Sequence, residues 1–458
     1  MQNFIKVERL SPKKTHALER LAHFGEIYSL FDDVKAGTQA ERCAQCGNPY
    51  CAVIGCPLHN YIPYWLKASA ENDRKTAFKL GNETSPFPEI LGRICPQDKL
   101  CEGACTLGAD NFGAVSIGAI ETAVTEGEFE LGATIDYPKA VLKKRAAIIG
   151  SGPASLSAAT FLARAGLTIE IFEKDERAGG LLTYGIPNFK LDKRVVNRRF
   201  EFLAKAGVKI HLGVEVGKDI NFDDLLRDFD AIFVGVGARR PARAKIENEN
   251  AEGVIGAVDF LSAAQRELFG STKKSPRNMK NKHIVVIGGG DTAMDCVRTA
   301  LRLGARSATC VYRRDEAKMP GSKKEYENAK EEGAIFTFNR APSKILVKNG
   351  KAIGAEFEET KIVDDGKRGK LVVVSGSATT IDADIVIMAL GFEHQDKSWL
   401  KGVNLDKRGA IIVGEDGQTS ADKVYGGGDA VRGASLAVNA AADGKKAAFA
   451  IIKRLSGA

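Results

Sequence analysis

Seven of the nine cysteines lie in one window of the chain, between Cys43 and Cys105. Zinc sites favour paired C-x2-C knuckles, and the window holds one such pair. Iron–sulfur clusters accept looser runs, and a cysteine followed by proline is typical of them. The spacing therefore favours iron–sulfur clusters, with zinc as the second interpretation and disulfides as the third. The run is Cys43-x2-Cys46-x4-Cys51-x4-Cys56-Pro57, followed by Cys95-Pro96-x4-Cys101-x3-Cys105.

The number of thiols in this window does not match two complete clusters. Two four-iron clusters take eight ligands, and the window supplies seven cysteines. Either one cluster has three irons, or one ligand is not sulfur. Glu121, 16 residues after Cys105, is a candidate oxygen ligand, although a solvated helix carboxylate is the simpler interpretation. Cys296 and Cys310 lie far outside the window and are expected to be small buried residues.

A glycine-rich turn, Gly150-Ser151-Gly152-Pro153-Ala154-Ser155, could bind a pyrophosphate. The glycines allow a tight turn and a bare backbone beside the phosphates, and the helix that follows offers free N–H groups. Glycine or alanine is usual at the third small position, which is Ser155 here. Glu173 follows 23 residues after Gly150, where a carboxylate would bind ribose hydroxyls and repel a 2′-phosphate. This turn suits FAD or NAD rather than NADP.

A second turn, Gly288-Gly289-Gly290-Asp291-Thr292-Ala293, has the opposite charge at the ribose position. Arg313 and Arg314 stand there, the first of them 25 residues after Gly288. Guanidinium groups bind a 2′-phosphate through charge-assisted hydrogen bonds, so this unit should prefer NADPH. A single glycine turn can serve packing alone. Two turns with opposite ribose charges indicate a flavin and NADPH that exchange a hydride.

A third glycine run lies near the end of the sequence, at Gly426-Gly427-Gly428-Asp429. A strand pattern precedes it, and a helical pattern follows from Ser435. Asp429 could bind the ribityl or phosphate region of a flavin by hydrogen bonds. An ordinary strand-to-helix turn with an aspartate cap is an equally good interpretation.

Each nucleotide turn needs a strand before it and a helix after it. The pattern predicts strands over 146–149, 167–173, 284–287 and 307–312, and helices over 153–165 and 291–303. These are two βαβ units about 138 residues apart, each heading a parallel sheet. The first 140 residues or so lack strand alternation and are expected to form short helices joined by loops. A polar, basic stretch over 271–282 is expected to be a linker.

Composition sets the outer limits of the interpretation. The chain has 458 residues, 44% apolar and 27% charged, which excludes a disordered chain, a collagen-like fibre and a small disulfide scaffold. The net charge of +8 is small against 66 basic and 58 acidic residues, so neither nucleic acid nor a membrane surface is indicated. The first residues contain no apolar run of the signal-peptide type, and we expect a cytoplasmic protein without membrane spans.

Taken together, these motifs resemble the small (beta) subunits of NADPH-dependent glutamate synthases over nearly the whole chain. That family shares its layout with the flavin half of dihydropyrimidine dehydrogenase. Ser155 departs from the glutamate synthase pattern, which usually has glycine there, and matches the serine of dihydropyrimidine dehydrogenase. Glu121 favours glutamate synthase, because the other enzyme uses glutamine as its non-cysteine ligand. The similar strings are residues 42–60 with 62, 63 and 65, residues 92–105, 179–191 and 289–298, and residues 312–316 with 319–321.

The resemblance implies which residues hold which group. One 4Fe-4S cluster would be held by Cys43, Cys46, Cys51 and Cys105, and the other by Cys56, Cys95, Cys101 and Glu121. Gly180, Leu181 and Lys190 would belong to a loop beside the flavin. Ala389 and Gly391 would lie near the nicotinamide nucleotide.

The resemblance also implies an α/β fold with two Rossmann-type domains of the glutathione-reductase type, preceded by a mainly helical iron–sulfur domain. The expected divisions are 1–140 for two clusters, 141–265 and 386–458 for FAD, and 266–385 for an inserted NADPH domain. Electrons would pass from NADPH through FAD and the clusters to a large (alpha) subunit that makes glutamate from glutamine and 2-oxoglutarate. No side chain is expected to act as general acid or nucleophile. The alternatives are an NADPH oxidoreductase with another acceptor (ferredoxin, a pyrimidine-reducing partner or a sulfur acceptor) and a non-catalytic assembly subunit.

Overall fold

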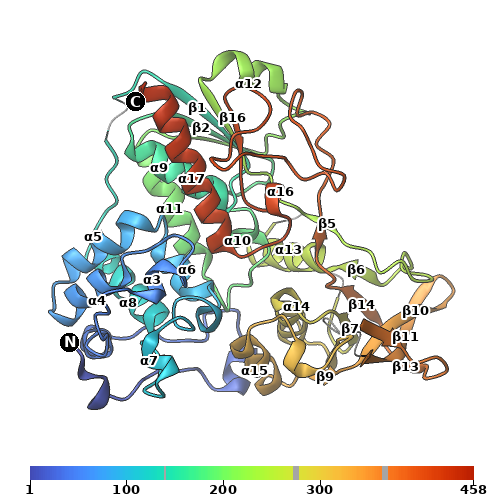
Figure 1. The fold of residues 1–458 in the computed structure, drawn as a ribbon. Helices are drawn as coiled ribbons and strands as arrows, with labels where there is room; N and C mark the ends of the chain where they lie inside the picture. The colour runs from blue at the N-terminus through green and yellow to red at the C-terminus, as the bar shows by residue number, and fades with distance from the viewer. Residues whose placement is uncertain (139–140, 272–277, 364–369, 458) are drawn as a thin grey trace.

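Short helices make up the N-terminal part of the chain, shown in blue in Figure 1. The computed structural model describes residues 1–138, 141–271, 278–363 and 370–457. Residue 140, the predicted end of the first domain, and residues 272–277 of the predicted linker lie outside the described residues. Several of these helices begin at residues suited to a helix start, such as Pro88 or the capping Asp32. The helices are α1 (Ala17–Leu21), α2 (Asp33–Ala40), α3 (Tyr50–Val53), α4 (Ile62–Ala70), α5 (Arg74–Thr84), α6 (Pro88–Ile94), α7 (Thr106–Ala109) and α8 (Ile117–Glu130), with 3-10 turns η1 (Asn3–Ile5) and η2 (Gln97–Lys99).

The first parallel sheet carries the first glycine turn. Its strand order is β16-β4-β1-β2-β3, and β4 is buried along its whole length, as expected for a sheet covered on both faces. The observed strands and helix around the turn lie within two residues of the predicted bounds. The strands are β1 (Arg145–Ile149), β2 (Thr168–Glu173), β3 (Lys209–Leu212), β4 (Ala231–Val234) and β16 (Val424–Gly426); the helices are α9 (Pro153–Arg164), α10 (Leu181–Tyr184), α11 (Lys193–Lys205), α12 (Phe222–Asp228), α16 (Asp429–Arg432) and α17 (Ala437–Ser456).

The second parallel sheet has the corresponding layout, with strand order β6-β14-β7-β8-β9. The second glycine turn follows its central strand, β7. An antiparallel sheet of β10 to β13 extends from this domain at the right of Figure 1. The strands are β6 (Val254–Gly256), β7 (His283–Ile287), β8 (Ser307–Val311), β9 (Ile335–Thr337), β10 (Arg340–Lys348), β11 (Lys351–Val363), β12 (Lys370–Val373), β13 (Thr379–Asp382) and β14 (Ile385–Met388); the helices are α13 (Ala257–Leu268), α14 (Asp291–Arg302) and α15 (Lys323–Glu331), with the 3-10 turn η3 (Glu316–Lys318).

The whole second sheet lies, in sequence, between β4 and β16 of the first sheet. The predicted α/β fold with two Rossmann-type domains is therefore confirmed. The chain crosses between the two at β5 (Arg240–Pro241) and β15 (Phe392–Glu393), which pair with each other. The predicted division after residue 265 falls inside α13, and the division after 385 falls inside β14. We propose divisions near 253 and 389, which keep β6, α13 and β14 with the second sheet.

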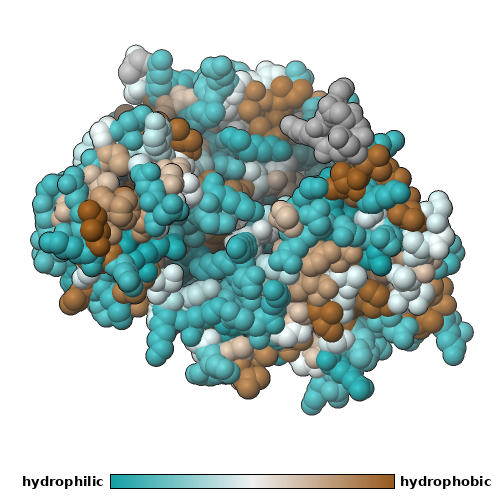
Figure 2. Space-filling view, turned by 60° about the horizontal axis from the view of Figure 1, so that its bottom comes forward, coloured by the Kyte–Doolittle hydropathy of each residue, from teal (hydrophilic) through white to brown (hydrophobic). Residues whose placement is uncertain are grey.

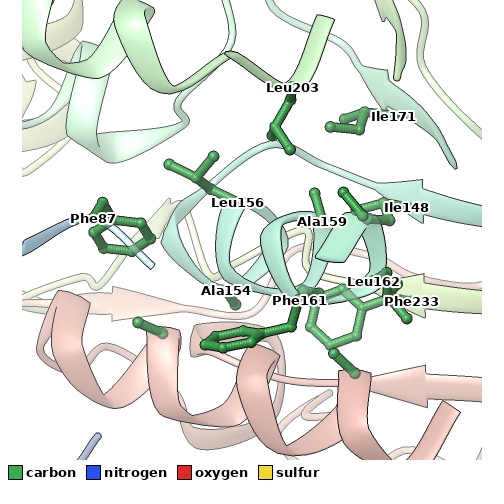
Figure 3. Packing of buried hydrophobic residues seen from close by; sticks show 14 of the residues in the cluster. Phe87, Ile148, Ala154, Leu156, Ala159, Phe161, Leu162, Ile171, Leu203 and Phe233 are labelled. Carbon is green, nitrogen blue, oxygen red and sulfur yellow. The ribbon is translucent and has the colours of Figure 1, made fainter. Parts of the chain in front are cut away.

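The main core lies between the first sheet and helices α9 and α17. Figure 3 shows α9 surrounded by buried residues of the sheet, such as Ile148 and Phe233, with Phe87 approaching from the N-terminal helices. Small residues let α17 approach α9 closely, since a Cβ added at Gly444 would meet the Ala154 carbonyl oxygen at 2.0 Å. Helix α6 is thus part of the same core as the first sheet. Helices α2, α4 and α8 pack around a separate core of their own.

Buried ion pairs also join the three parts of the chain. Glu89 on α6 accepts hydrogen bonds from Arg199 on α11, with neither side chain more than 1% exposed. Arg20, near the start of the chain, pairs with Glu332 at the end of α15. These contacts fix the helical part against both nucleotide-type domains.

Candidate functional site

The first glycine turn leaves an open space at the start of α9. Gly150 has φ +89°, and a Cβ there would meet the Gly235 carbonyl oxygen at 2.7 Å, so only glycine fits. Its N–H donates to the Phe172 carbonyl at 2.8 Å, which ties the turn to β2. Gly152, the residue that caps α9, would place a Cβ in empty space, with no atom within 4 Å. A group that binds the helix N-terminus has room at this point.

Glu173 lies beside the first turn, as the sequence predicts for a ribose-binding carboxylate. One carboxylate oxygen accepts from the Ser151 N–H at 2.9 Å and from the Ser151 hydroxyl, and the other accepts from the Asp175 N–H at 2.8 Å. Burial raises its pKa, although the Ser151 hydrogen bond opposes this rise. These hydrogen bonds hold the Glu173 carboxylate in one orientation.

Ser155 plays a packing role in the structure. It is fully buried, and a Cβ built at Gly235 would meet its hydroxyl oxygen at 2.2 Å. The hydroxyl has no hydrogen-bond partner among the described residues. Serine is small enough for this contact between α9 and the end of β4, which explains why the usual glycine or alanine can be replaced here.

Two further glycine segments lie against the first turn. Gly180 has φ +54°, and its Cβ would meet the Gly152 Cα at 2.9 Å. Gly428 has φ +65°, and its Cβ would meet the Ala154 Cβ at 2.9 Å. Asp429, which follows, accepts a hydrogen bond from the Ser435 N–H at 3.2 Å, and burial raises its pKa to about 7. The third glycine run predicted from the sequence thus faces the same space as the first.

The second glycine turn repeats the construction of the first. The Gly288 N–H donates to the Val311 carbonyl at 3.0 Å, and a Cβ at Gly288 would meet the Ala389 carbonyl oxygen at 2.3 Å. Gly290 caps α14, and a Cβ there meets no atom within 4 Å, as at Gly152. Ala293 is buried inside the helix. Both turns therefore present an open helix N-terminus.

The loop after η3 covers one side of this second turn. Asp291 accepts a hydrogen bond from the Ser322 N–H at 2.8 Å, and the Gly321 N–H donates to the Gly289 carbonyl at 3.1 Å. Lys99 of the N-terminal part donates to the Gly321 and Pro320 carbonyls, at 3.2 and 2.9 Å. The cysteine-containing part thereby contacts the loop that covers the second turn.

Arg313 and Arg314 follow β8 and come after Tyr312, whose ring lies beneath Gly289. Arg313 is exposed and Arg314 half-buried, and within the described ranges neither guanidinium forms an ion pair. Both are available to an anion at the carboxyl end of β8. Gly391 lies further along, where its carbonyl accepts from the Ala242 N–H at 3.0 Å at the crossing between the domains.

Lys190 connects the two domains. Its ammonium group donates to Asp295 on α14 at 3.0 Å and lies 3.9 Å from Glu325 on α15. Burial alone would lower the pKa of Lys190, but the carboxylates of Asp295 and Glu325 raise it, so the side chain stays charged. Asp295 and Glu325 were missed by the sequence analysis, since the pairing depends on how the domains pack.

The two turns open into one cavity of about 1010 Å³. The face seen in Figure 2 is hollowed near its centre, and mostly hydrophilic side chains surround that hollow. Cys95 of the cysteine window also lines the cavity, so the cysteine region meets the space between the turns. The predicted site residues that line it are Gly150, Gly152, Pro153, Ala154, Glu173, Gly180, Leu181, Lys190, Gly290, Asp291, Thr292, Gly428, Asp429 and Cys95. Those that do not are Ser155, Gly288, Ala293, Arg313, Arg314, Ala389, Gly391, Glu121 and the remaining cysteines of the window.

The seven window cysteines are free thiols that fall into two neighbouring groups. Burial, together with the neighbouring thiols of Cys105, Cys43 and Cys46, raises the pKa of Cys51 to about 12, so these four lie together. Gln45 donates a hydrogen bond to the Cys43 sulfur at 3.2 Å. Loops bring Cys105 back to Cys51 across more than fifty residues.

The second group contains three thiols and one carboxylate. Burial raises the pKa of Cys101 well above its ordinary value, with smaller contributions in the same direction from Glu102, Cys95, Cys56 and Glu121. Burial likewise raises the pKa of Glu121 to about 8. In their ionised forms these four buried groups would repel one another. A bound cationic centre would attract all four and so stabilise the ionised forms.

Among the described residues, no group of three or more His, Cys, Asp or Glu side chains is close enough to hold a single metal ion.

Comparisons with known proteins agree with this division of the chain. Residues 144–444 match the family described as pyridine nucleotide-disulphide oxidoreductase. Residues 20–133 match the family described as dihydropyrimidine dehydrogenase domain II, 4Fe-4S cluster. Among the described residues, no helix is both long and apolar enough to cross a bilayer.

Two curated relatives are similar over most of the chain. The glutamate synthase (NADPH) small chain of Escherichia coli (strain K12) is 46% identical, with 99% of this chain and 98% of that protein covered. The putative oxidoreductase UacF of the same organism is 44% identical, with 96% of this chain and 71% of that protein covered. Among solved structures, Mycobacterium tuberculosis FprA in complex with NADPH has a TM-score of 0.60 at 20% identity, covering 69% of this chain and 85% of FprA. That likeness concerns the fold alone.

Proposed function

Because the chain belongs to the family of glutamate synthase (NADPH) small chains, a group of oxidoreductases, we propose that it is the electron-input subunit of such an enzyme. It takes electrons from NADPH and delivers them, through FAD and two 4Fe-4S clusters, to a large subunit that converts glutamine and 2-oxoglutarate to glutamate. We place this activity in the cytoplasm. The observation that carries the proposal is the single cavity lined by both glycine turns and by Cys95.

The residues of the two turns fit two different nucleotides. The open helix N-terminus at Gly152 and the carboxylate of Glu173 suit the pyrophosphate and ribose of FAD, with Asp429 at the ribityl side. The open helix N-terminus at Gly290 suits the pyrophosphate of NADPH, with Arg313 and Arg314 available to its 2′-phosphate. FAD, when bound, accepts a hydride, and the clusters carry electrons one at a time.

The protein residues supply positioning and charge for this transfer. Hydride transfer needs no general acid or nucleophile, and Lys190 is held charged by Asp295 rather than free to exchange a proton. Residues of both turns line the same cavity, so the two nucleotides would share one space.

The cysteine groups continue this route away from the cavity. We assign Cys56, Cys95, Cys101 and Glu121 to one 4Fe-4S cluster and Cys43, Cys46, Cys51 and Cys105 to the other. The first set includes Cys95 in the cavity wall, so it stands next to the flavin side. No cysteine of the second set lines the cavity. Cys46 of this set is half-buried, and its sulfur lies 3.6 Å from the Thr106 hydroxyl.

A second candidate function is an NADPH oxidoreductase that serves another electron acceptor. It is favoured by the 44% identity to the putative oxidoreductase UacF, close to the 46% for the E. coli small chain. The cofactors and the cavity are the same in both proposals, and only the partner of the outer cluster differs.

Glutamate formation separates the two proposals. The purified chain is mixed with a candidate large subunit, NADPH, glutamine and 2-oxoglutarate, and glutamate is measured with each component omitted in turn. We expect glutamate only with both proteins present, and NADPH oxidation by this chain alone only with an artificial acceptor. Rapid ferredoxin reduction without glutamate formation by the pair would instead support the second candidate.

A further inference from the structure

Asn60 contacts the one non-cysteine residue of the proposed ligand sets. Its amide Nδ2 donates a hydrogen bond to Glu121 Oε1 at 2.7 Å, and Asn60 is 2% exposed. Asn60 stands four residues after Cys56 and just before α4. The contact therefore joins the loop of one proposed ligand to the side chain of another.

The orientation of this amide is fixed by its second contact. The Thr84 hydroxyl donates to Asn60 Oδ1 at 3.0 Å, and the same hydroxyl oxygen accepts from the Tyr61 N–H at 3.3 Å. Because the Tyr61 N–H can only donate, the hydroxyl hydrogen is left for Asn60. A flipped amide would place its oxygen against the carboxylate, so the network assigns the N–H₂ group to Glu121.

Among the described residues, Asn60 is the one hydrogen-bond donor to the Glu121 carboxylate. The neighbouring Glu89 repels it, and the thiols of Cys56, Cys95 and Cys101 are near enough for its charge to raise their pKa values. With Oε1 occupied by Asn60, the second oxygen is the one left for a metal. An outer group that fixes a ligand in this way is typical of metal sites.

The geometry points to Asn60 as a positioning residue that turns the Glu121 carboxylate so that one oxygen faces the three thiols. This inference rests on the proposed function, because it takes Glu121 as a cluster ligand. The fold supports Asn60 from the flavin side as well: Lys445 of α17 donates to the Leu58 and Thr84 carbonyls at 3.0 and 3.1 Å. The segment that carries Asn60 is therefore held at both ends.

The test replaces Asn60 by leucine, which keeps the size and removes the donor. In the purified holoprotein we expect an altered electron paramagnetic resonance signal and midpoint potential for one reduced cluster, and an unchanged signal for the other. Iron release to a chelator should be about tenfold faster, the lower end of the usual range for outer-group changes. Thr125→Ala is the matched control, since the Thr125 hydroxyl bonds the Glu121 backbone carbonyl and leaves the carboxylate untouched.

Two further variants keep the test decisive. Thr84→Val removes the hydroxyl that orients Asn60 and should change the same signal in the same direction but less, even if Asn60→Leu does not fold. In a Glu121→Cys background the thiolate needs no amide, so adding Asn60→Leu should have little further effect on the cluster signal.

The outcomes separate the inference from the proposed function. If Glu121→Ala alters one cluster while Asn60→Leu and Thr84→Val leave both signals and iron release as in the wild type, the positioning role of Asn60 is wrong and the ligand assignment stands. If Glu121→Ala itself leaves both clusters unchanged, the ligand assignment fails and the inference fails with it.

Discussion

Arg20 and Glu332, 312 residues apart in the chain, form an ion pair of 2.8 Å with neither side chain more than 1% exposed. Glu332 also accepts hydrogen bonds from Arg298 and Arg302 of α14. The Glu332 carboxylate thus pairs with arginines of both the helical part and the second nucleotide-type domain. The orientation of that domain depends on a segment that lies before the cysteine window.

Replacing Arg20 by methionine should destabilise the protein by about 3 kcal/mol. That is the low end for breaking a buried ion pair, because Arg298 and Arg302 still compensate Glu332. Urea unfolding measures the change. Arg194→Met is the matched control: its side chain is 90% exposed and pairs with Asp192, so a change of about 0–1 kcal/mol is expected. Equal effects of the two substitutions would show that the buried ion pair of Arg20 with Glu332 does not stabilise the protein.

Acid should weaken the protein partly through Glu332. Burial alone would raise the pKa of Glu332, but hydrogen bonds from Arg302 and Arg298 lower it to about 2. The stabilisation is therefore complete above the ordinary glutamate pKa and is lost as the pH falls toward 2. The difference in unfolding free energy between wild type and Glu332→Gln should shrink between pH 6 and 3.5. A difference independent of pH over that range would show that Glu332 is not held charged in this way.

Gly152→Ala should separate folding from flavin binding. A Cβ at Gly152 meets no atom within 4 Å, so the flavin-free protein should lose about 1 kcal/mol or less, mainly by weaker capping. The methyl group would occupy the space proposed for the pyrophosphate, and the FAD content of the purified protein should fall. Gly444→Ala is the contrasting variant: its Cβ would lie 2.0 Å from the Ala154 carbonyl, so it should destabilise the fold by about 1–3 kcal/mol. Full FAD occupancy in Gly152→Ala would place the flavin elsewhere.

Arg313→Gln with Arg314→Gln should reduce the preference for NADPH. Charge-assisted hydrogen bonds contribute about 1.5–3 kcal/mol each, so kcat/KM for NADPH should fall by at least about tenfold more than that for NADH. Arg306→Gln tests for a general effect of charge, because Arg306 is exposed at the opposite end of β8. A parallel loss with both nucleotides would remove the 2′-phosphate role of the arginine pair.

The local parts of the fold could be predicted from the sequence. The strands and helices around Gly150 and Gly288 follow from glycine turns between apolar runs, which depend on neighbouring residues alone. β6 was missed, because three residues are too short to show a strand period, and this placed the predicted division inside α13.

The contacts within the candidate site could not be predicted in the same way. The return of Cys105 to Cys51 is made by loops, and spacing along the chain does not encode it. Asn60 gave no signal beyond its place after Cys56, because its role depends on a helix more than fifty residues later. Lys190 was assigned to the flavin loop, but its partner Asp295 belongs to the inserted domain.

The pair formed by Arg20 and Glu332 also bears on how this chain can be recombined. A chimera with one crossover anywhere between these residues takes the arginine from one parent and the carboxylate from the other. Such a chimera keeps the ion pair only if both parents have a cation at position 20 and a carboxylate at position 332. The helical part and the inserted domain should thus be exchanged together, although the 4Fe-4S and nucleotide modules look separable in the linear sequence.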